Sequence, residues 1–216
     1  MANVLLGATG SVAAVRIPAL YDALVSAGYA VKVVATDAAT YFFDPAAVGP
    51  AGTVVRDADE WPGGRYVRDA PVLHIELRKW ADAFVIAPLD ANTLAKLAVG
   101  LCDNCLTCVW RAWDPARPVV LAPAMNTLMW EHPFTRRHLR SLAADAGAGH
   151  IPGHLDGPPL IDQINDRSKT LRVVAPVEKR LACGDIGPGG LADVADIVAA
   201  VREMLSRSAA NPATTP

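Results

Sequence analysis

The chain has 216 residues and a formal net charge of -2, and hydrophobic residues make up 52% of it. A chain of this length is enough for one domain with a sizeable core. We expect neither a nucleic-acid partner nor a membrane span, because there is no basic stripe and no apolar run of about 18 residues.

The N-terminal residues MANVLLGATG run directly into a strand-like segment, without the basic region of a signal peptide. There are four cysteines, and three of them fall within residues 102–108, which does not resemble a disulfide framework. We therefore expect a cytoplasmic protein with reduced thiols.

Apolar strands alternate with helices over the first 147 residues. In chain order, the patterns predict strand 4–10, helix 11–28, strand 29–36, helix 37–43, strand 54–57, a loop to 71, helix 74–81, strand 82–89, helix 90–113 with a break near Asp103 and Asn104, strand 117–125 and helix 132–147. Strands that are apolar throughout are typical of a parallel sheet covered on both faces. We expect a single α/β domain with a doubly wound (Rossmann/flavodoxin-like) parallel sheet, and ligands at the carboxyl ends of its strands.

The C-terminal third has a different composition. Residues 148–180 show little periodicity and are rich in Gly, Pro and charge, so we expect a flap or an extended hairpin there. An amphipathic helix is predicted at 192–208 and a frayed tail at 209–216. The domain would then span 1–208, with an inserted flap and a clamp within 148–192.

Polar residues follow several predicted strands. Gly10 and Ser11 lie between the first strand and its helix, where free N–H groups bind phosphate or where Ser11 acts as an N-cap. Thr36 follows the second strand, and the same two interpretations, phosphate binding and helix capping, apply to it. Residues 90–93 (DANT) either cap the helix that follows the third strand or present polar groups to a ligand.

Metal chemistry is the weaker interpretation of the cysteines and histidines. Cys102, Cys105 and Cys108 are spaced by three residues, which allows an iron–sulfur or zinc site but also places them on one helix face as small hydrophobic side chains. None of the five histidines has HExxH-type spacing. Cys183 precedes a Gly-rich stretch and is either a proton-exchanging thiol or a loop residue without a role.

Residues 122–130 (APAMNTLMW) follow a buried strand. Turns that only reverse the chain favour Gly, Asp, Ser and Pro, whereas this segment is bulky and rich in sulfur. The composition favours a loop that lies against a flat ligand and presents one amide, that of Asn126.

Three segments together resemble the homo-oligomeric flavin-containing cysteine decarboxylases. PLDANT resembles their PxSANT motif, and PAMNTLMW resembles their PxMNxxMW motif. RLACGDIGPGG resembles the mobile substrate-recognition clamp of the phosphopantothenoylcysteine decarboxylase branch. The likeness runs from Val4 to Leu142 and again from Val177 to Ala200.

The resemblance implies FMN as cofactor and a homo-oligomer, a trimer or a dodecamer built from trimers, with the flavin near subunit contacts. Asp90 stands where the motif has serine, and we expect it to cap its helix, because an anion would repel the flavin phosphate. The residues implied at the flavin are Gly10, Ser11, Val12, Ala13, Thr36, Asp37, Ala38, Ala39, Phe42, Asp90, Ala91, Asn92, Thr93 and Ala124.

The same resemblance implies roles in catalysis. His74 matches the active-site base, Cys183 the proton donor, and Asn126 the residue that binds the substrate carboxylate. No metal is implied. The implied substrate contacts are Asn126, Met129, Arg180 and Ala182.

The implied reaction is FMN-dependent oxidative decarboxylation of a C-terminal cysteine moiety, first of all 4'-phosphopantothenoylcysteine to 4'-phosphopantetheine. Two alternatives stay open: a peptidyl-cysteine decarboxylase that forms a C-terminal aminoenethiol, and a flavin prenyltransferase-like FMN-binding protein. Residues 153–176 look like an insertion, and the clamp ends in GGLAD instead of the family's methionine and Ala-Glu pair. Both departures lie on the substrate side, so the sequence predicts the flavin chemistry more firmly than the substrate.

Overall fold

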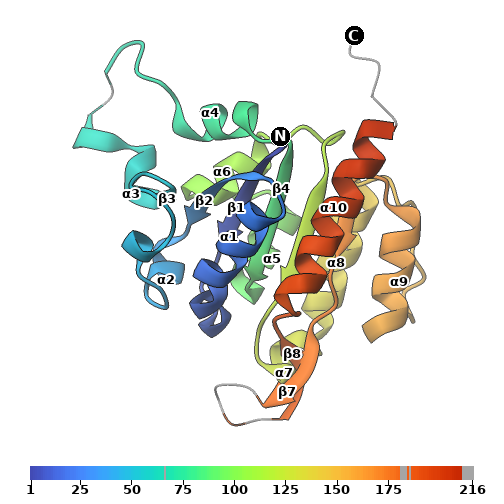
Figure 1. The fold of residues 1–216 in the computed structure, drawn as a ribbon. Coiled ribbons are helices and arrows are strands. Elements are labelled where there is room, and N and C mark those ends of the chain that lie inside the picture. The colour runs from blue at the N-terminus through green and yellow to red at the C-terminus, as the bar shows by residue number, and fades with distance from the viewer. Residues whose placement is uncertain (66, 181–183, 185, 211–216) are drawn as a thin grey trace.

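A six-stranded sheet forms the centre of the molecule in the computed structural model, which describes residues 1–65, 67–180, 184 and 186–210 (Figure 1). Its order is β3-β2-β1-β4-β5-β6, and every neighbouring pair is parallel. The predicted doubly wound sheet is confirmed. The strands are β1 (Asn3–Ala8), β2 (Ala30–Ala35), β3 (Val54–Arg56), β4 (Ala83–Leu89), β5 (Val119–Pro123) and β6 (Leu171–Val173).

Helices cover both faces of this sheet, and a two-stranded antiparallel hairpin of β7 (Val177–Arg180) and β8 (Ile186–Gly190) lies apart from it. The helices are η1 (Val12–Arg16), α1 (Ile17–Ser26), α2 (Asp37–Thr40), η2 (Pro45–Ala47), α3 (Asp57–Glu60), η3 (Pro62–Gly64), α4 (Leu73–Trp80), α5 (Ala91–Val99), α6 (Cys105–Arg111), α7 (Thr127–Trp130), α8 (Pro133–Asp145), α9 (Gly157–Arg167) and α10 (Val194–Ala210).

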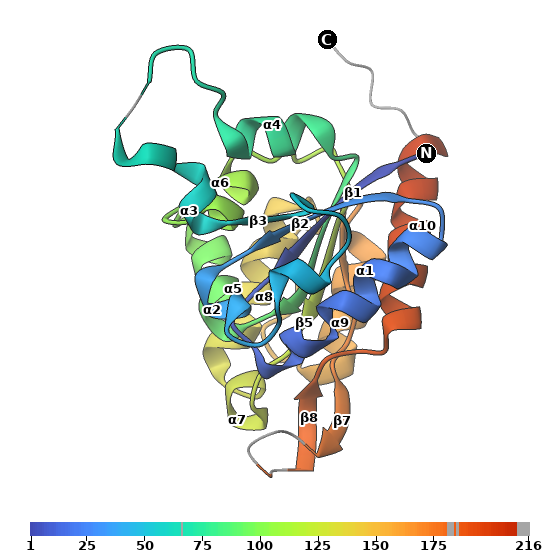
Figure 2. The same cartoon turned by 60° about the vertical axis from the view of Figure 1, so that its left-hand side comes forward.

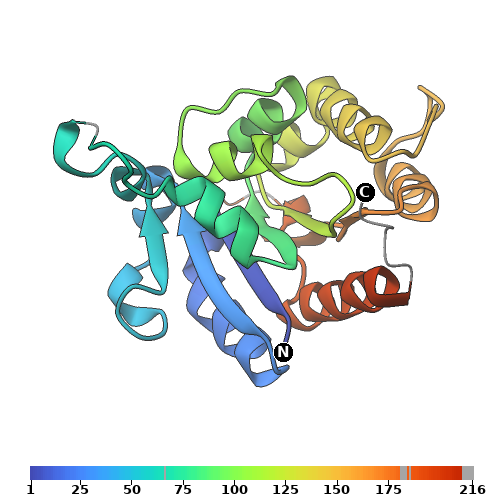
Figure 3. The same ribbon diagram turned by 90° about the horizontal axis from the view of Figure 1, so that it is seen from above.

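The core is divided into two layers by the sheet. Helices α1 and α10 cover one face, and α5, α6, α8 and α9 cover the other (Figure 3). All seven residues of β4 are buried, as expected for a strand with helices on both sides. Leu5 packs in one layer, while its neighbours Val4 and Leu6 pack in the other, because successive side chains of a strand point to opposite faces.

The strand order reverses between β1 and β4. The chain runs from β1 outward to β3 and then returns to place β4 on the other side of β1. The loops after these two strands therefore diverge to opposite faces and leave a crevice between them. This is the point at which a doubly wound sheet binds its ligands.

Local signals explain where several elements begin and end. The predicted break within 90–113 is confirmed: α5 ends at Gly100, whose φ is +75°, and α6 begins after Asn104, whose side chain accepts from the N–H of Thr107 at 2.9 Å. The prediction of a loop from 57 to 71 is wrong in part, since α3 and η3 occupy its first half. The four-residue length of α3 explains why periodicity did not detect it.

The prediction of a flap or hairpin over 148–180 is wrong for most of the segment. Residues 157–167 form α9, and β6 extends the main sheet. The side chain of Asn165 joins the two, because it accepts from the N–H of Val173 at 2.8 Å and donates to its carbonyl at 2.9 Å. The Gly-Pro-Pro at the start suggested a loop, although Pro is favourable in the first turn of a helix.

Replacing Ile164 by alanine tests whether α9 belongs to the core. Ile164 has no exposed surface and packs in the layer with Leu160 and Ile161. We expect Ile164→Ala to lower the free energy of unfolding by about 2–5 kcal/mol, measured by urea denaturation. The control Asp166→Ala, at an exposed position of the same helix, should change it by less than about 0.5 kcal/mol. Equal effects of the two variants would show that α9 does not pack as described.

Candidate active site

A cavity of about 560 Å³ lies at the carboxyl edge of the sheet, where β1, β4 and β5 end. Helix α7 and the β7–β8 hairpin lie side by side at this edge (Figure 2). The cavity is lined by Gly10, Ser11, Val12, Ala13, Val15, Arg16, Phe42, Asp90, Ala91, Asn92, Ala124, Met125, Asn126, Met129, Lys179, Arg180, Gly189, Gly190 and Leu191.

The turn after β1 forms one wall. Ser11 is the N-cap of η1, and its Oγ accepts from the N–H of Ala13 at 3.3 Å. A side chain at Gly10 would come within 2.7 Å of the Cβ of Ala38, so only glycine lets this turn lie against α2. The chain thus passes directly from β1 into the cavity wall.

Asp90 begins the opposite wall. Its Oδ1 accepts from the N–H of Thr93 at 2.6 Å, and its own N–H donates to the Oγ of Thr9 at 2.7 Å. The expectation that Asp90 caps α5 is confirmed. With this carboxylate held by the helix, Ala91 and Asn92 face the cavity from the first turn.

Five residues that the resemblance implied at the flavin do not line the cavity: Thr36, Asp37, Ala38, Ala39 and Thr93. Thr36 instead caps α2 by accepting from the N–H of Ala39 at 3.2 Å, and Asp37 donates its N–H to Asp57 at 2.9 Å. Ala38 lies behind Gly10, and Thr93 is buried within α5. These residues support the wall from behind.

The loop that follows β5 forms the floor. Asn126 is the N-cap of α7, and its Oδ1 accepts from the N–H of Leu128 at 2.8 Å. Both methionines of the loop, Met125 and Met129, line the cavity beside it. Trp130 instead packs in the core, so the segment anchors one end in the interior while the rest faces the cavity.

The hairpin closes a further side, at the segment that the sequence predicted as a clamp, although the individual residues Lys179, Gly189, Gly190 and Leu191 were not predicted as lining residues. The N–H of Met125 donates to the carbonyl of Gly189 at 2.9 Å, which ties β8 to the floor. Lys179 donates to the carbonyl of Leu191 at 3.2 Å. The missed lining residues are Val15, Arg16, Lys179, Gly189, Gly190 and Leu191; the one available signal was the run of glycines, which permits close backbone approach.

We expect Gly189→Ala to destabilise the protein and to weaken ligand binding. Gly189 has a φ of +130°, and an added Cβ would collide with the carbonyl oxygen of Met125. The matched control is Gly147→Ala, which also has a positive φ (+80°) but meets no atom within 4 Å. The control carries only the backbone cost of about 1–3 kcal/mol. Gly189→Ala should lower the melting temperature further and reduce FMN retention on gel filtration; an effect no greater than that of Gly147→Ala would contradict the contact.

His74 is not brought to the cavity of its own chain. It lies in α4, near the end of the molecule opposite the hairpin (Figure 1). Its Nδ1 lies within hydrogen-bond distance of Oε1 of Glu60, and its backbone N–H donates to Oε2 of the same carboxyl group at 3.0 Å. The His74 side chain is 23% exposed and that of Glu60 only 3%. Two other predicted residues, Cys183 and Ala182, lie outside the described residues.

The cysteines of 102–108 differ in burial: Cys105 is buried, Cys108 is partly buried and Cys102 is exposed. Over the described residues, no three His, Cys, Asp or Glu side chains come together as a metal site would require. Burial is the main cause that raises the pKa of the buried Cys105 thiol, and it raises that of Cys108 to about 11. Both thiols are therefore protonated at neutral pH.

Comparison with known proteins decides the family. A family model described as Flavoprotein matches residues 1–206. The chain belongs to the Flavoprotein family. Within it, the chain is 45% identical over 206 residues to mouse (Mus musculus) phosphopantothenoylcysteine decarboxylase, an alignment that covers 95% of this chain and 88% of the mouse protein.

Two solved structures of flavoproteins show the same kinship. A cysteine-to-serine mutant of PPC decarboxylase, complexed with pantothenoylaminoethenethiol, is 42% identical, with a TM-score of 0.76 over 95% of this chain and 98% of that one. The FMN binding protein AtHal3 is 43% identical, with a TM-score of 0.72 over 94% of this chain and 95% of that one. The predicted kinship with the flavin-containing cysteine decarboxylases is confirmed.

The cavity of this flavoprotein fits FMN in size and in chemistry. Its volume lies within the roughly 300–1,000 Å³ usual for ligand pockets. Ala124, Met125 and Leu191 give apolar surface for a flat ring, while Asn92 gives an amide. Arg16 supplies a positive charge beside the turn after β1, and the one carboxylate among the described lining residues, that of Asp90, accepts from the N–H of Thr93 in its helix.

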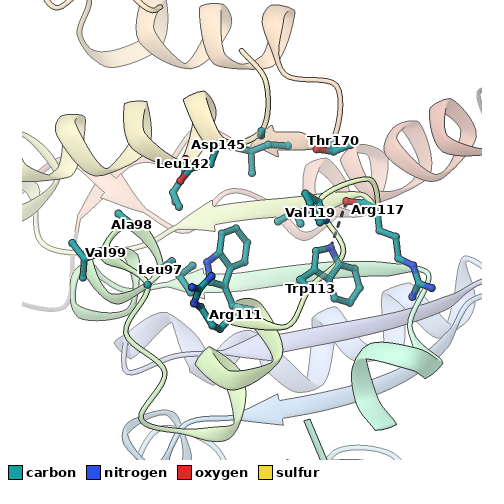
Figure 4. A pocket seen from close by; sticks show the side chains of 15 residues that line it. Leu97, Ala98, Val99, Arg111, Trp113, Arg117, Val119, Leu142, Asp145 and Thr170 are labelled. Carbon is teal, nitrogen blue, oxygen red and sulfur yellow. Dashed lines mark hydrogen bonds between the residues drawn. The ribbon is translucent and has the colours of Figure 1, made fainter. Parts of the chain in front are cut away.

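A second cavity, of about 500 Å³, lies at the other edge of the sheet (Figure 4). Its walls come from the starts of β5 and β6 and from α5, α6 and α8. Arg117, which borders it, donates to the carbonyls of Arg78 and Ala81 at 3.0 and 2.9 Å. The indole N–H of Trp113 donates to the Arg117 carbonyl at 3.4 Å. None of the described candidates for flavin or substrate lines this cavity.

No helix in the described part of this flavoprotein combines the length and the apolar character that crossing a bilayer demands.

Proposed function

We propose that this protein decarboxylates 4'-phosphopantothenoylcysteine with FMN as its cofactor. The observation that carries the proposal is the position of Asn126 and Arg180 on the walls of one cavity, together with the flavin-facing turns after β1 and β4. The 45% identity to a phosphopantothenoylcysteine decarboxylase supports the choice of substrate.

A cysteine amide does not lose CO2 readily, because the carbanion that would remain has no electron sink. FMN, when bound, supplies two-electron chemistry that provides one. The chain's own contribution is to hold the carboxylate and to move protons. A carboxylate only accepts hydrogen bonds, so the side-chain N–H of Asn126 is the group that would donate to the substrate carboxylate.

Positive charge around the cavity suits an anionic ligand. Arg16, Lys179 and Arg180 all line it, from η1 and from β7. Such groups would bind the phosphates of cofactor and substrate. Met125 and Met129 would exclude water from the reacting atoms. The thiol of Cys183 would donate the final proton to the product carbon.

We further propose that the active site is completed by a second copy of the chain. Val12, Val15 and Met129 line the cavity yet are 48%, 54% and 54% exposed in the single chain. Apolar surface of this kind next to a site favours an interface. The proposed base, His74, lies in α4 and is absent from its own chain's cavity, which supports its action in the cavity of a neighbouring subunit.

The function is tested by incubating the purified FMN-loaded protein with 4'-phosphopantothenoylcysteine or with peptides that end in cysteine. We expect loss of CO2 from the first substrate, detected by mass spectrometry. Turnover of the peptides alone would replace the proposal by peptidyl-cysteine decarboxylation. If the recombinant protein neither binds FMN nor changes either substrate, the proposal fails.

Mixing two inactive variants tests the shared site. His74→Gln and Asn126→Asp should each be inactive as homo-oligomers. After unfolding and refolding together, mixed oligomers would contain cavities with an intact His74 from one copy and an intact Asn126 from another. We expect a substantial part of the activity to return. Mixed oligomers that stay inactive would show that the site is contained in one chain, and a protein that sediments as a monomer would likewise contradict a shared site.

A further inference from the structure

The region around His74 contains a buried carboxylate that the reaction outlined above does not use. Glu60 ends α3, and its side chain is only 3% exposed. Burying an ionised carboxylate costs several kcal/mol unless its oxygens are matched by donors. Its one ion pair among the described residues is with His74, and no lysine or arginine there pairs with it.

Both oxygens of Glu60 are directed to the same residue. Oε2 accepts from the backbone N–H of His74 at 3.0 Å, and Oε1 lies within hydrogen-bond distance of its Nδ1. The N-cap of α4, Val72, makes no side-chain capping bond, so Glu60 replaces the missing cap. A cap alone needs one oxygen, however, and the second oxygen is used to hold the imidazole ring.

The neighbours of Glu60 keep this carboxylate in place. Burial raises the pKa of the Cys105 thiol on α6, and the nearby Glu60 carboxylate raises it further. At the other end of α3, Asp57 accepts from the N–H of Cys105 at 3.3 Å and from the N–H of Asp37 at 2.9 Å. The short helix is thus tied to α2, α4 and α6, and Glu60 meets His74 at a defined angle.

We propose that Glu60 is a positioning residue that sets the tautomer of His74, an inference that rests on the proposed role of His74 as base. With the ring proton kept at Nδ1 by the carboxylate, Nε2 carries the lone pair. In the reaction, the S–H bond of the substrate breaks, the proton goes to Nε2, and the electron pair stays on sulfur. The resulting imidazolium is stabilised by the adjacent carboxylate of Glu60.

Glu60→Gln tests the proposal because the amide has one acceptor and one donor group. Its oxygen is needed by the backbone N–H of His74, so its NH2 would face Nδ1 and force the ring proton to Nε2. In the opposite orientation, the NH2 of the glutamine would face the backbone N–H of His74, and two donors would meet without an acceptor. The variant should therefore give the wrong tautomer in an otherwise similar site. The matched control is Glu76→Gln on α4, the helix of His74, where the Glu76 side chain is 56% exposed and pairs with Lys79 at 3.4 Å.

The tautomer is measured from the 15N shifts of the imidazole by solid-state NMR at mildly alkaline pH, with His74→Gln used to identify the signal. We expect the proton at Nδ1 in the wild type and in Glu76→Gln, and at Nε2 in Glu60→Gln. Activity should fall about 100-fold in kcat for Glu60→Gln, with KM and FMN content little changed.

Two results would overturn the proposal. One is a wild-type His74 that carries its proton on Nε2, which needs no variant and so does not depend on whether Glu60→Gln folds. The other is a Glu60→Gln enzyme with an unchanged tautomer and kcat. If the wild type turns over neither substrate, the proposed function fails, but the NMR measurement still decides whether Glu60 sets the tautomer.

Discussion

Replacing Cys183 by serine is expected to stop the reaction after CO2 has left, so that the product accumulates as the enethiol, two hydrogens short of the saturated aminoethanethiol. The last step needs a proton at the carbon that lost its carboxylate. A thiol ionises near neutral pH, whereas a serine hydroxyl is a far weaker acid. Loss of a general acid slows such a step by about 10²–10⁴-fold. Mass spectrometry separates the two products by the two missing hydrogens.

The control for this experiment is Cys102→Ser, because Cys102 is an exposed thiol that does not line the flavin cavity. It should give the saturated product at the wild-type rate. Formation of the saturated product by Cys183→Ser at an unchanged rate would show that another group supplies the proton. The two serine variants together thus distinguish a specific proton donor from a general effect of losing a thiol.

Replacing Asn126 by aspartate is expected to abolish decarboxylation while leaving the fold intact. The new carboxylate can still cap α7 by accepting from the N–H of Leu128, as the amide oxygen does at 2.8 Å. It removes the N–H donor to the substrate carboxylate, which is worth about 1.5–3 kcal/mol. It also places two like charges in contact, which costs about 4 kcal/mol at 4 Å in a medium of effective dielectric 20.

Together these terms predict a fall in kcat/KM of at least about 10³-fold. Steady-state kinetics measure it, and the flavin absorbance shows whether FMN is retained. The control is Asn104→Asp, which makes the same chemical change at the N-cap of α6 and also keeps its capping bond. If Asn126→Asp retains more than a tenth of the wild-type activity, Asn126 does not bind the carboxylate.

Some of the site could be read from local patterns because the interactions are local. Ser11 and Asp90 cap the helices that begin just after them; capping was expected for Asp90 and was one of the two interpretations left open for Ser11. The position of these turns on one edge of the sheet followed from the alternation of strands and helices, since carboxyl ends of parallel strands meet at one edge. The amide of Asn126 beside two methionines was likewise visible from its loop alone.

Other parts depend on contacts between distant segments. Arg16 and Lys179 line the same cavity because η1 and β7, which are far apart in the sequence, come together in the fold. Helix α9 and β6 were mistaken for a flap, because the burial that stabilises them comes from the rest of the fold. The pairing of Glu60 with His74 spans 14 residues and an irregular loop, with no periodicity that would predict it.

The sequence by itself determined the family, the alternation of strands and helices, and the motifs at the strand ends, because each is set by residue type and short-range spacing. The tertiary structure alone decided which of these motifs share a cavity, and that His74 is held by Glu60 away from that cavity. The physical reason is that burial and hydrogen bonding between segments distant in the chain are properties of the packed molecule, and no short stretch of sequence encodes them.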